Sequence, residues 1–206
     1  MKIMLLNGSP KSNNSASEII INGLRQRLGT TNEYVLLNAM KTNKAEFIEK
    51  TNGINAIVIV FPLYVDGIPS HLLRLLYDVK NEIGCTNNQL IIYAIVNNGF
   101  YEGTQNSIAL EMIQNFCVSA NLKWGQGLGV GAGGMSSAAP IGQGPMKNLG
   151  LALDKISANI KNSATDDNFF IEPNFPKFLY KISAHFGWRR QAKDNGIKHK
   201  DIYSKR

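Results

Sequence analysis

The sequence predicts a doubly wound α/β fold, in which helices cover both faces of a five-stranded parallel sheet. Two observations favour this fold class. Apolar, strand-like runs alternate with segments of helical periodicity five times along the chain. Two of these runs, residues 55–61 and 89–96, are rich in β-branched and other apolar residues, which is typical of strands covered on both faces.

The expected elements follow one another in order along the chain. Strands are expected at 2–7, 33–38, 55–61, 89–96 and, more weakly because of its glycines, 123–130. Helices are expected at 15–28, 44–50, 70–83, 104–122 and 146–160. Ser15 and Glu18 have the spacing of a capping box, which marks the start of the first helix. Gly29 and Gly84 follow helical segments and are interpreted as stop signals.

The chain divides into a neutral body and a basic end. Residues 162–168 have the composition of a linker, so we expect one domain over 1–163 and a basic, partly helical C-terminal extension over 164–206. The net charge is +7, and residues 173–206 hold nine of the 22 basic residues but two of the 15 acidic ones. The whole positive excess therefore lies at the C-terminal end, and the basic pI does not indicate a nucleic-acid-binding main domain.

The apolar runs and the cysteines bear on the location of the protein. The longest apolar runs are far shorter than the roughly 20 residues of a membrane span, and residues 3–6 are too short for the core of a signal peptide. We therefore expect a cytoplasmic protein without membrane insertion. Cys85 and Cys117 lie in unrelated contexts, so reduced thiols are expected rather than a disulfide or a metal site.

A polar segment with the properties of a phosphate-binding loop joins the first strand to the first helix. It runs from Asn7 to Ser15 and ends at the capped helix start, where backbone N–H groups and the helix dipole favour an anion. Gly8 permits a tight turn, and short polar side chains follow it, Ser12 among them. The alternative is a polar loop that only caps the helix, but its position after a parallel strand favours a ligand. The GxxxxGK[ST] pattern is absent, so nucleotide hydrolysis is not expected.

This Asn-Gly-Ser-Pro-Lys sequence, followed by Ser and Asn residues, resembles the NAD(P)H-dependent FMN reductase family of flavodoxin-like proteins. The resemblance implies a flavodoxin-like sheet of strand order 2-1-3-4-5 and an FMN phosphate held by the loop. The cofactor-binding residues expected in the loop are Ser9, Lys11, Asn13, Asn14 and Ser15. Some relatives carry a cysteine motif for an iron–sulfur cluster, but residues 40–53 contain no cysteine, so no cluster is expected.

Two further loops resemble the flavin-binding loops of that family. Residues 61–69 (FPLYVDGIP) follow the third expected strand, and residues 97–102 (NNGFYE) follow the fourth. A Pro-rich turn with a tyrosine presents backbone amides and an aromatic edge to a flat ring; the alternative is that these aromatic side chains only pack over the turn and the core. The flavin-binding residues expected here are Pro62, Leu63, Tyr64, Val65, Gly67, Asn97, Asn98, Gly99, Phe100 and Tyr101.

A glycine-rich segment contains a GxGxxG pattern that we do not interpret as a dinucleotide-binding fingerprint. Its glycines are Gly129, Gly131 and Gly134, and Asp154 lies 20 residues after the last of them. The fingerprint requires a helix directly after the glycines, whereas residues 135–144 form a loop of small residues. A flexible edge beside the flavin and a plain glycine-rich turn are the two interpretations left open.

Together these features predict an FMN-dependent oxidoreductase that passes a hydride from NADH or NADPH to FMN and on to a small acceptor, such as a quinone, a nitroaromatic or a flavin. FMN is expected rather than FAD because the loop offers one phosphate cradle. The alternatives are an FMN-binding electron-transfer protein acting between protein partners, and a non-enzymatic flavin-binding module acting through its basic tail. His71, His185 and His199 lack a convincing partner, so no catalytic acid or base is assigned, and the cofactor carries the chemistry.

The C-terminal extension carries large apolar residues at near-helical spacing, which must pack against a surface. They are Phe175, Phe178, Leu179, Ile182 and Phe186. Its own domain, a second subunit, an anionic membrane and nucleic acid are the four alternatives. No nucleic-acid-binding motif is present and the stripe lacks a long basic face, so packing against protein is favoured. In the related flavin enzymes the site commonly lies at a two-fold interface, so we expect a homodimer.

Overall fold

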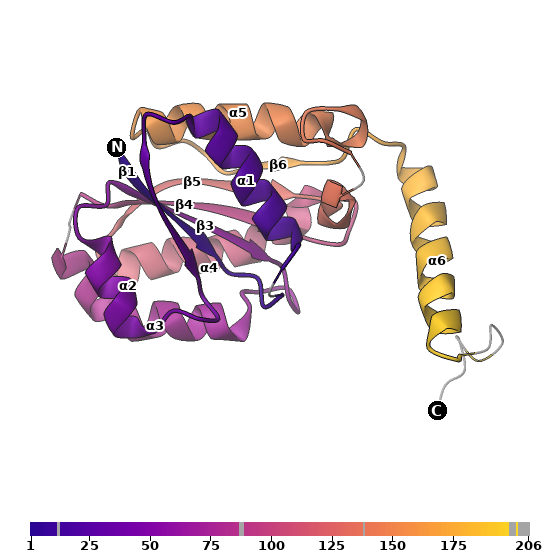
Figure 1. Ribbon diagram of the computed structural model, residues 1–206, viewed down its shortest axis with the longest axis horizontal. Helices are drawn as coiled ribbons and strands as arrows, with labels where there is room; N and C mark the ends of the chain where they lie inside the picture. The colour runs from indigo at the N-terminus through magenta and orange to yellow at the C-terminus, as the bar shows by residue number, and fades with distance from the viewer. Residues whose placement is uncertain (12, 87–88, 138, 198–200, 202–206) are drawn as a thin grey trace. The chain divides into compact units, whose positions relative to one another are not determined.

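A parallel sheet of six strands organises residues Met1–Pro173 in the computed structural model, which describes the chain except for residues 12, 87–88, 138, 198–200 and 202–206. The strand order is β2-β1-β3-β4-β5-β6, and each neighbouring pair is parallel (Figure 1). The strands are β1 Lys2–Asn7, β2 Glu33–Asn38, β3 Ala56–Pro62, β4 Ile91–Asn97, β5 Lys123–Val130 and β6 Phe169–Ile171. The predicted flavodoxin-like fold and its order 2-1-3-4-5 are confirmed, but the predicted number of five strands is wrong because β6 extends the sheet.

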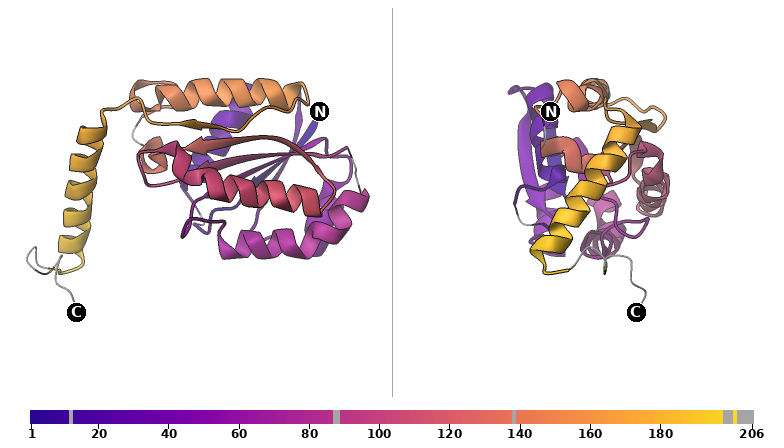
Figure 2. Two further views of the ribbon diagram at one scale, coloured as in Figure 1. Left: turned by 180° about the vertical axis from the view of Figure 1, so that it is seen from behind. Right: turned by 90° about the vertical axis from the view of Figure 1, so that its right-hand side faces the viewer.

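Helices cover both faces of this sheet (Figures 1 and 2). One face carries α1 Ala16–Leu28 and α5 Lys147–Lys161, and the other carries α2 Lys44–Thr51, α3 Ser70–Thr86 and α4 Ser107–Ser119. Three short 3-10 helices lie in the loops: η1 Gly103–Asn106, η2 Gly133–Ser137 and η3 Gly144–Met146. Successive strand residues enter opposite cores, since Ile3 lies in the core under α1 and α5 while Met4 lies in the other.

The ends of two helices test the predicted start and stop signals. Ser15 is the N-cap of α1, and its hydroxyl oxygen accepts a hydrogen bond of 3.1 Å from the backbone N–H of Glu18, as the capping-box spacing predicts. Gly84 does not end α3, which continues to Thr86. A Cβ atom at Gly84 would overlap the backbone carbonyl of Ala120, so this glycine permits close packing of α3 against the end of α4.

Strand β6 follows the segment 162–168 that we interpreted as a linker. Buried Gln126 on β5 fastens this segment to the sheet, because its Nε2 donates to the carbonyl of Asp167 at 2.8 Å. The side-chain oxygen of Asn168 accepts from the N–H of Gly127, also at 2.8 Å. The chain then pairs with β5 over three residues, so the first compact unit ends at Pro173.

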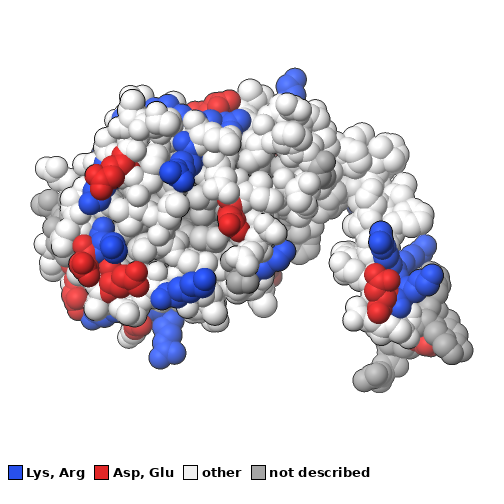
Figure 3. Space-filling model, in the orientation of Figure 1, with Lys and Arg blue, Asp and Glu red and all other residues white. Residues whose placement is uncertain are grey.

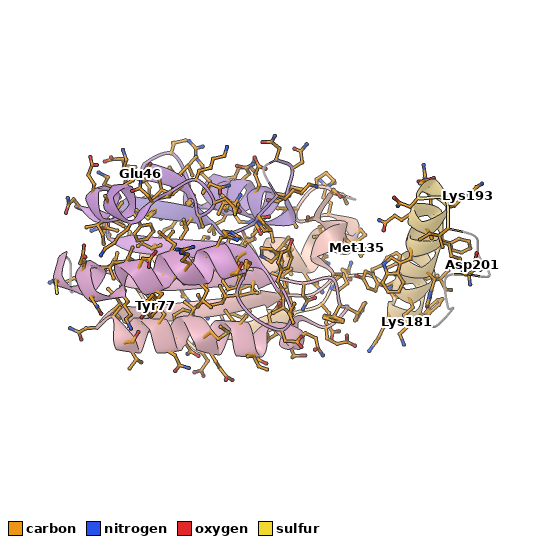
Figure 4. All side chains as sticks on the ribbon, turned by 90° about the horizontal axis from the view of Figure 1, so that it is seen from below. Glu46, Tyr77, Met135, Lys181, Lys193 and Asp201 are labelled. Atoms are coloured by element: carbon orange, nitrogen blue, oxygen red, sulfur yellow. The ribbon has the colours of Figure 1, made fainter. Side chains whose placement is uncertain are left out.

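The second compact unit, Asn174–Arg206, contains the helix α6 Lys177–Asp194. All of α6 is described, and none of its residues is buried. Large apolar side chains are exposed along it, together with the basic residues that Figures 3 and 4 show on this helix, such as Lys181 and Lys193. No helix among the described residues has the length and apolarity needed to cross a bilayer. Cys85 is exposed and Cys117 buried, both as free thiols, and burial raises the pKa of Cys117 to about 12.

Candidate functional site

The candidate site lies where β1, β3 and β4 end. These strands are parallel neighbours, so the loops that follow them gather at one edge of the sheet. The direction in which strands are added to the sheet changes here. β1 lies between β2 and β3, so β2 is added on one side of β1 and the strands from β3 onward are added on the other side. In open α/β sheets this switch point is where ligands commonly bind.

The loop after β1 is held by its own side chains. The side-chain oxygen of Asn7 accepts from the N–H of Ser9 at 2.9 Å, and the hydroxyl oxygen of Ser9 accepts from the N–H of Lys11 at 3.2 Å. Ser9 and Ser15 are buried, and the hydroxyl oxygen of each accepts a hydrogen bond from a backbone N–H group, so both side chains help to fix the conformation of the loop. The ammonium of Lys11 donates to the carbonyl of Asn14 at 3.2 Å and stays exposed beside the loop.

The second half of this loop presents hydrogen-bond donors. Among the described residues, no backbone N–H group from residues 13–17 donates to an acceptor. Asn14 has a φ of 52°, a left-handed conformation that asparagine tolerates, and it turns the chain into the N-terminus of α1. This cluster of free N–H groups at the positive end of a helix dipole is suited to a phosphate. Ser12, which we named for the same loop, lies outside the described residues.

The loop after β3 contains a tight reversal. Tyr64 and Gly67 exchange two backbone hydrogen bonds of 3.0 Å, and Val65 and Asp66 between them have φ values of 48° and 57°. This is the geometry of a turn that asparagine and glycine usually form, and a β-branched residue in it is strained. Val65 is 102% exposed and Tyr64 is 49% exposed, so the turn presents apolar surface outward. Such strain is concentrated at ligand-binding sites in proteins.

The residues predicted to bind flavin in the loop after β4 fall into a buried group and a more exposed group. Asn97 and Asn98 are buried; the amide of Asn97 donates at 3.0 Å to the hydroxyl of Ser17, and that of Asn98 donates at 3.0 Å to the carbonyl of Glu102. These side chains therefore hold the loop. Phe100, by contrast, is 53% exposed, and Gly99 is exposed beside it, while Tyr101 is partly buried.

The glycine-rich segment after β5 packs directly on the loop after β4. The N–H of Gly133 donates to the carbonyl of Asn98 at 2.6 Å, and a Cβ atom at Gly131 would overlap the carbonyl oxygen of Tyr101. The segment continues into η2 and not into an α-helix, which agrees with its rejection as a dinucleotide fingerprint. Its glycines permit backbone-to-backbone contact with the candidate site.

Three hydrogen bonds join the three loops to one another. The amide of Asn97 reaches Ser17 at the start of α1, and the carbonyl of Asn97 accepts from the N–H of Leu63 at 2.8 Å. The third bond joins Nε2 of His71, in the first turn of α3, to the carbonyl oxygen of Gly8 at 3.1 Å. Burial lowers the pKa of His71, and the bond to Gly8 opposes this effect. The sequence had suggested no partner for His71, because Gly8 lies 63 residues away.

Of the two other histidines, His185 packs edge-to-face against Trp188 on α6, and His199 lies outside the described residues. Among the described residues no cluster of three or more histidine, cysteine, aspartate or glutamate side chains is placed to hold a metal ion. Among the described residues, the site therefore offers a ligand hydrogen-bond donors from backbone and hydroxyl groups, next to exposed apolar and aromatic side chains.

No protein-family model and no curated protein matches the sequence, whereas many solved structures match the fold. An NADH:FMN oxidoreductase is 11% identical with a TM-score of 0.63, over 80% of this chain and 90% of that one. An NADPH-quinone reductase from P. pentosaceus is 14% identical, with a TM-score of 0.58 over 76% and 98%. A flavodoxin from Streptococcus pneumoniae TIGR4 is 12% identical, with a TM-score of 0.57 over 80% and 100%. The chain is thus a protein of the flavodoxin-like fold.

Proposed function

We propose that the protein binds FMN at the ends of β1, β3 and β4 and acts as an FMN-dependent oxidoreductase. NADH or NADPH supplies a hydride, and a small acceptor such as a quinone, a nitroaromatic or a flavin receives the electrons. The observation that carries the proposal is the cluster of free N–H groups at residues 13–17, fastened by hydrogen bonds to two loops with exposed aromatic side chains.

The described residues fit the chemical parts of FMN. The N–H groups of residues 13–17, the hydroxyls of Ser9 and Ser15 and the ammonium of Lys11 can hold a phosphate. Tyr64 and Phe100 offer exposed aromatic surface from the other two loops, as a flat, mostly apolar ring requires. Bound FMN would supply the capacity to take up a hydride and release electrons, and the chain would orient it. One anion cradle favours FMN over FAD.

The similar structures named above support a redox function but leave two versions of it. Two are oxidoreductases by their descriptions, and a third is a flavodoxin, so an FMN-binding electron-transfer protein acting between protein partners is the alternative. The visible spectrum of the purified protein, followed by stopped-flow mixing with NADH and NADPH, separates these functions. We expect a bound flavin whose absorbance is bleached rapidly by one of the two nicotinamides. A protein that binds no FMN contradicts the proposal, and a flavoprotein that neither nicotinamide reduces supports the alternative.

We expect the double substitution Asn14→Ala and Ser15→Ala to weaken FMN binding about tenfold to a hundredfold, since it removes two polar side chains from the proposed phosphate-binding loop. Fluorescence titration with FMN measures this change. The N-cap substitution Asn43→Ala is the matched control, because Asn43 caps α2 through a 3.0 Å bond to the N–H of Glu46 and is not in the proposed cradle. Wild-type FMN affinity in the double variant would place the phosphate elsewhere.

We also infer that the protein is a homodimer in which α6 packs against a second copy. Phe178, Ile182 and Phe186 are four residues apart and share one side of α6, whereas Tyr180 and Trp188 lie near the opposite side. These two sets form two apolar rows on opposite sides of α6. An anionic bilayer covers only one side of a helix, so it would leave one of the two rows in water. Protein surfaces on both sides can cover both rows, and this two-sided pattern supports burial within an assembly.

A further inference from the structure

His71 joins the loop after β3 to the first residue of the loop after β1. It lies in the first turn of α3, and its Nε2 atom is 3.1 Å from the carbonyl oxygen of Gly8. A carbonyl oxygen only accepts hydrogen bonds, so Nε2 must carry the hydrogen. Burial lowers the pKa of the imidazole below its usual value, with the bond to Gly8 as the smaller, opposing effect. The side chain is therefore mainly neutral at pH 7 and acts as a hydrogen-bond donor.

Gly8 is enclosed on the same side of the sheet as α3. Its N–H donates to the carbonyl of Val60 at 2.8 Å, and a Cβ atom on it would lie 2.6 Å from Cδ2 of Leu72 and 2.8 Å from Cβ of Phe61. Leu72 and Phe61 belong to the core under α2, α3 and α4. The free N–H groups of residues 13–17, however, lie at the N-terminus of α1, which covers the opposite face. The Gly8 carbonyl therefore lies on the α3 face of the sheet, and the proposed phosphate cradle lies on the α1 face.

We propose that His71 is a positioning residue for FMN binding, which holds the Gly8 carbonyl on the α3 face so that the loop presents N–H donors to the phosphate. This inference rests on the proposed function and adds a residue that orients its site. A carbonyl oxygen carries partial negative charge, so a carbonyl free to turn toward the phosphate would repel it. The bond from His71 removes that freedom and satisfies a partly buried acceptor.

Three substitutions of His71 separate the hydrogen bond from the bulk of the side chain. In His71→Gln the amide nitrogen stands the same number of bonds from Cα as Nε2 of histidine, whereas in His71→Asn the same amide is one methylene shorter. His71→Leu removes the donor. We expect the leucine and asparagine variants to bind FMN about three- to tenfold more weakly, as the loss of one neutral hydrogen bond implies. The glutamine variant should stay within about twofold of the wild type.

Riboflavin lacks the phosphate, so its affinity distinguishes a specific effect on phosphate binding from a general loss of structure, which would weaken the binding of both flavins. Flavin fluorescence titrations of all variants should show lost FMN affinity with unchanged riboflavin affinity. Tyr77→Ala, an exposed site farther along α3 (Figure 4), is the control and should leave both affinities unchanged.

Several results would overturn the positioning role. Wild-type FMN-to-riboflavin ratios in His71→Leu and His71→Asn would do so, as would equal losses for both flavins in every His71 variant. If the leucine variant fails to fold, the glutamine and asparagine pair still decides. A wild-type protein without FMN affinity would instead remove the proposed function before any variant is compared.

Discussion

Replacing Gly131 by alanine should destabilise the protein by about 3 kcal/mol and weaken flavin binding, the first effect being typical of overpacking in a close-packed interior. The added Cβ atom would overlap the carbonyl oxygen of Tyr101 and lie 2.8 Å from the backbone nitrogen of Gly103. Both are backbone atoms, so no flexible side chain can move aside. The loop after β4, which carries the exposed Phe100, must therefore shift. Urea denaturation measures the first effect and flavin titration the second.

Gly134 provides the matched control three residues away. It is exposed, and apart from its chain neighbours no described residue has a heavy atom within 4 Å of a Cβ atom placed on it. Gly134→Ala should change the free energy of unfolding by less than about 0.5 kcal/mol, as is usual for surface sites. If the two substitutions have equal effects, the contact between the glycine-rich segment and the loop after β4 does not explain the need for glycine at position 131.

Much of the fold could be predicted because its main signals are local. The apolar runs that became β3 and β4 are buried on both faces, and the capping signal at Ser15 depends on a residue three positions away. Strand β6 could not be predicted in this way. It is three residues long and follows a polar, acidic segment, and it is held by Gln126 and other groups of β5 about 40 residues earlier.

The loops of the candidate site could be predicted from their position after strands, but the roles of individual side chains could not. The flavin contact predicted for Asn97 stays a prediction, but the donation of its amide to Ser17, 80 residues away in sequence, could not be foreseen. His71 has no partner that the sequence reveals, because its partner is the backbone carbonyl of Gly8. Every residue has a backbone carbonyl whatever its side chain, so a sequence pattern cannot show which carbonyl accepts a given hydrogen bond. Phe100 and Tyr64 remain exposed, as a ligand contact requires.

Removing residues 168–206 should leave the first unit about 3–5 kcal/mol less stable than removing only residues 174–206, so the two truncated proteins are compared with each other. The longer deletion removes β6, whose three apolar residues are partly buried against the domain, and leaves β5 as an open edge. It also removes Asn168, which accepts from Gly127 and from the indole of Trp124. Chemical denaturation of the two truncated proteins measures the difference, and equal stability would show that β6 contributes little.

The shorter deletion also tests the proposed homodimer. A protein ending at Pro173 keeps every strand of the sheet but lacks α6, so we expect it to be a folded monomer, whereas the full chain should be a dimer by light scattering and sedimentation. Full-length protein with Phe178, Ile182 and Phe186 replaced by serine should also be monomeric, because one of the two apolar rows is then lost, while Ser183→Ala on the same helix should stay dimeric. A dimer that survives the loss of residues 174–206 would assign its interface to the flavodoxin-like domain, and α6 would then need a different partner to cover its apolar side chains.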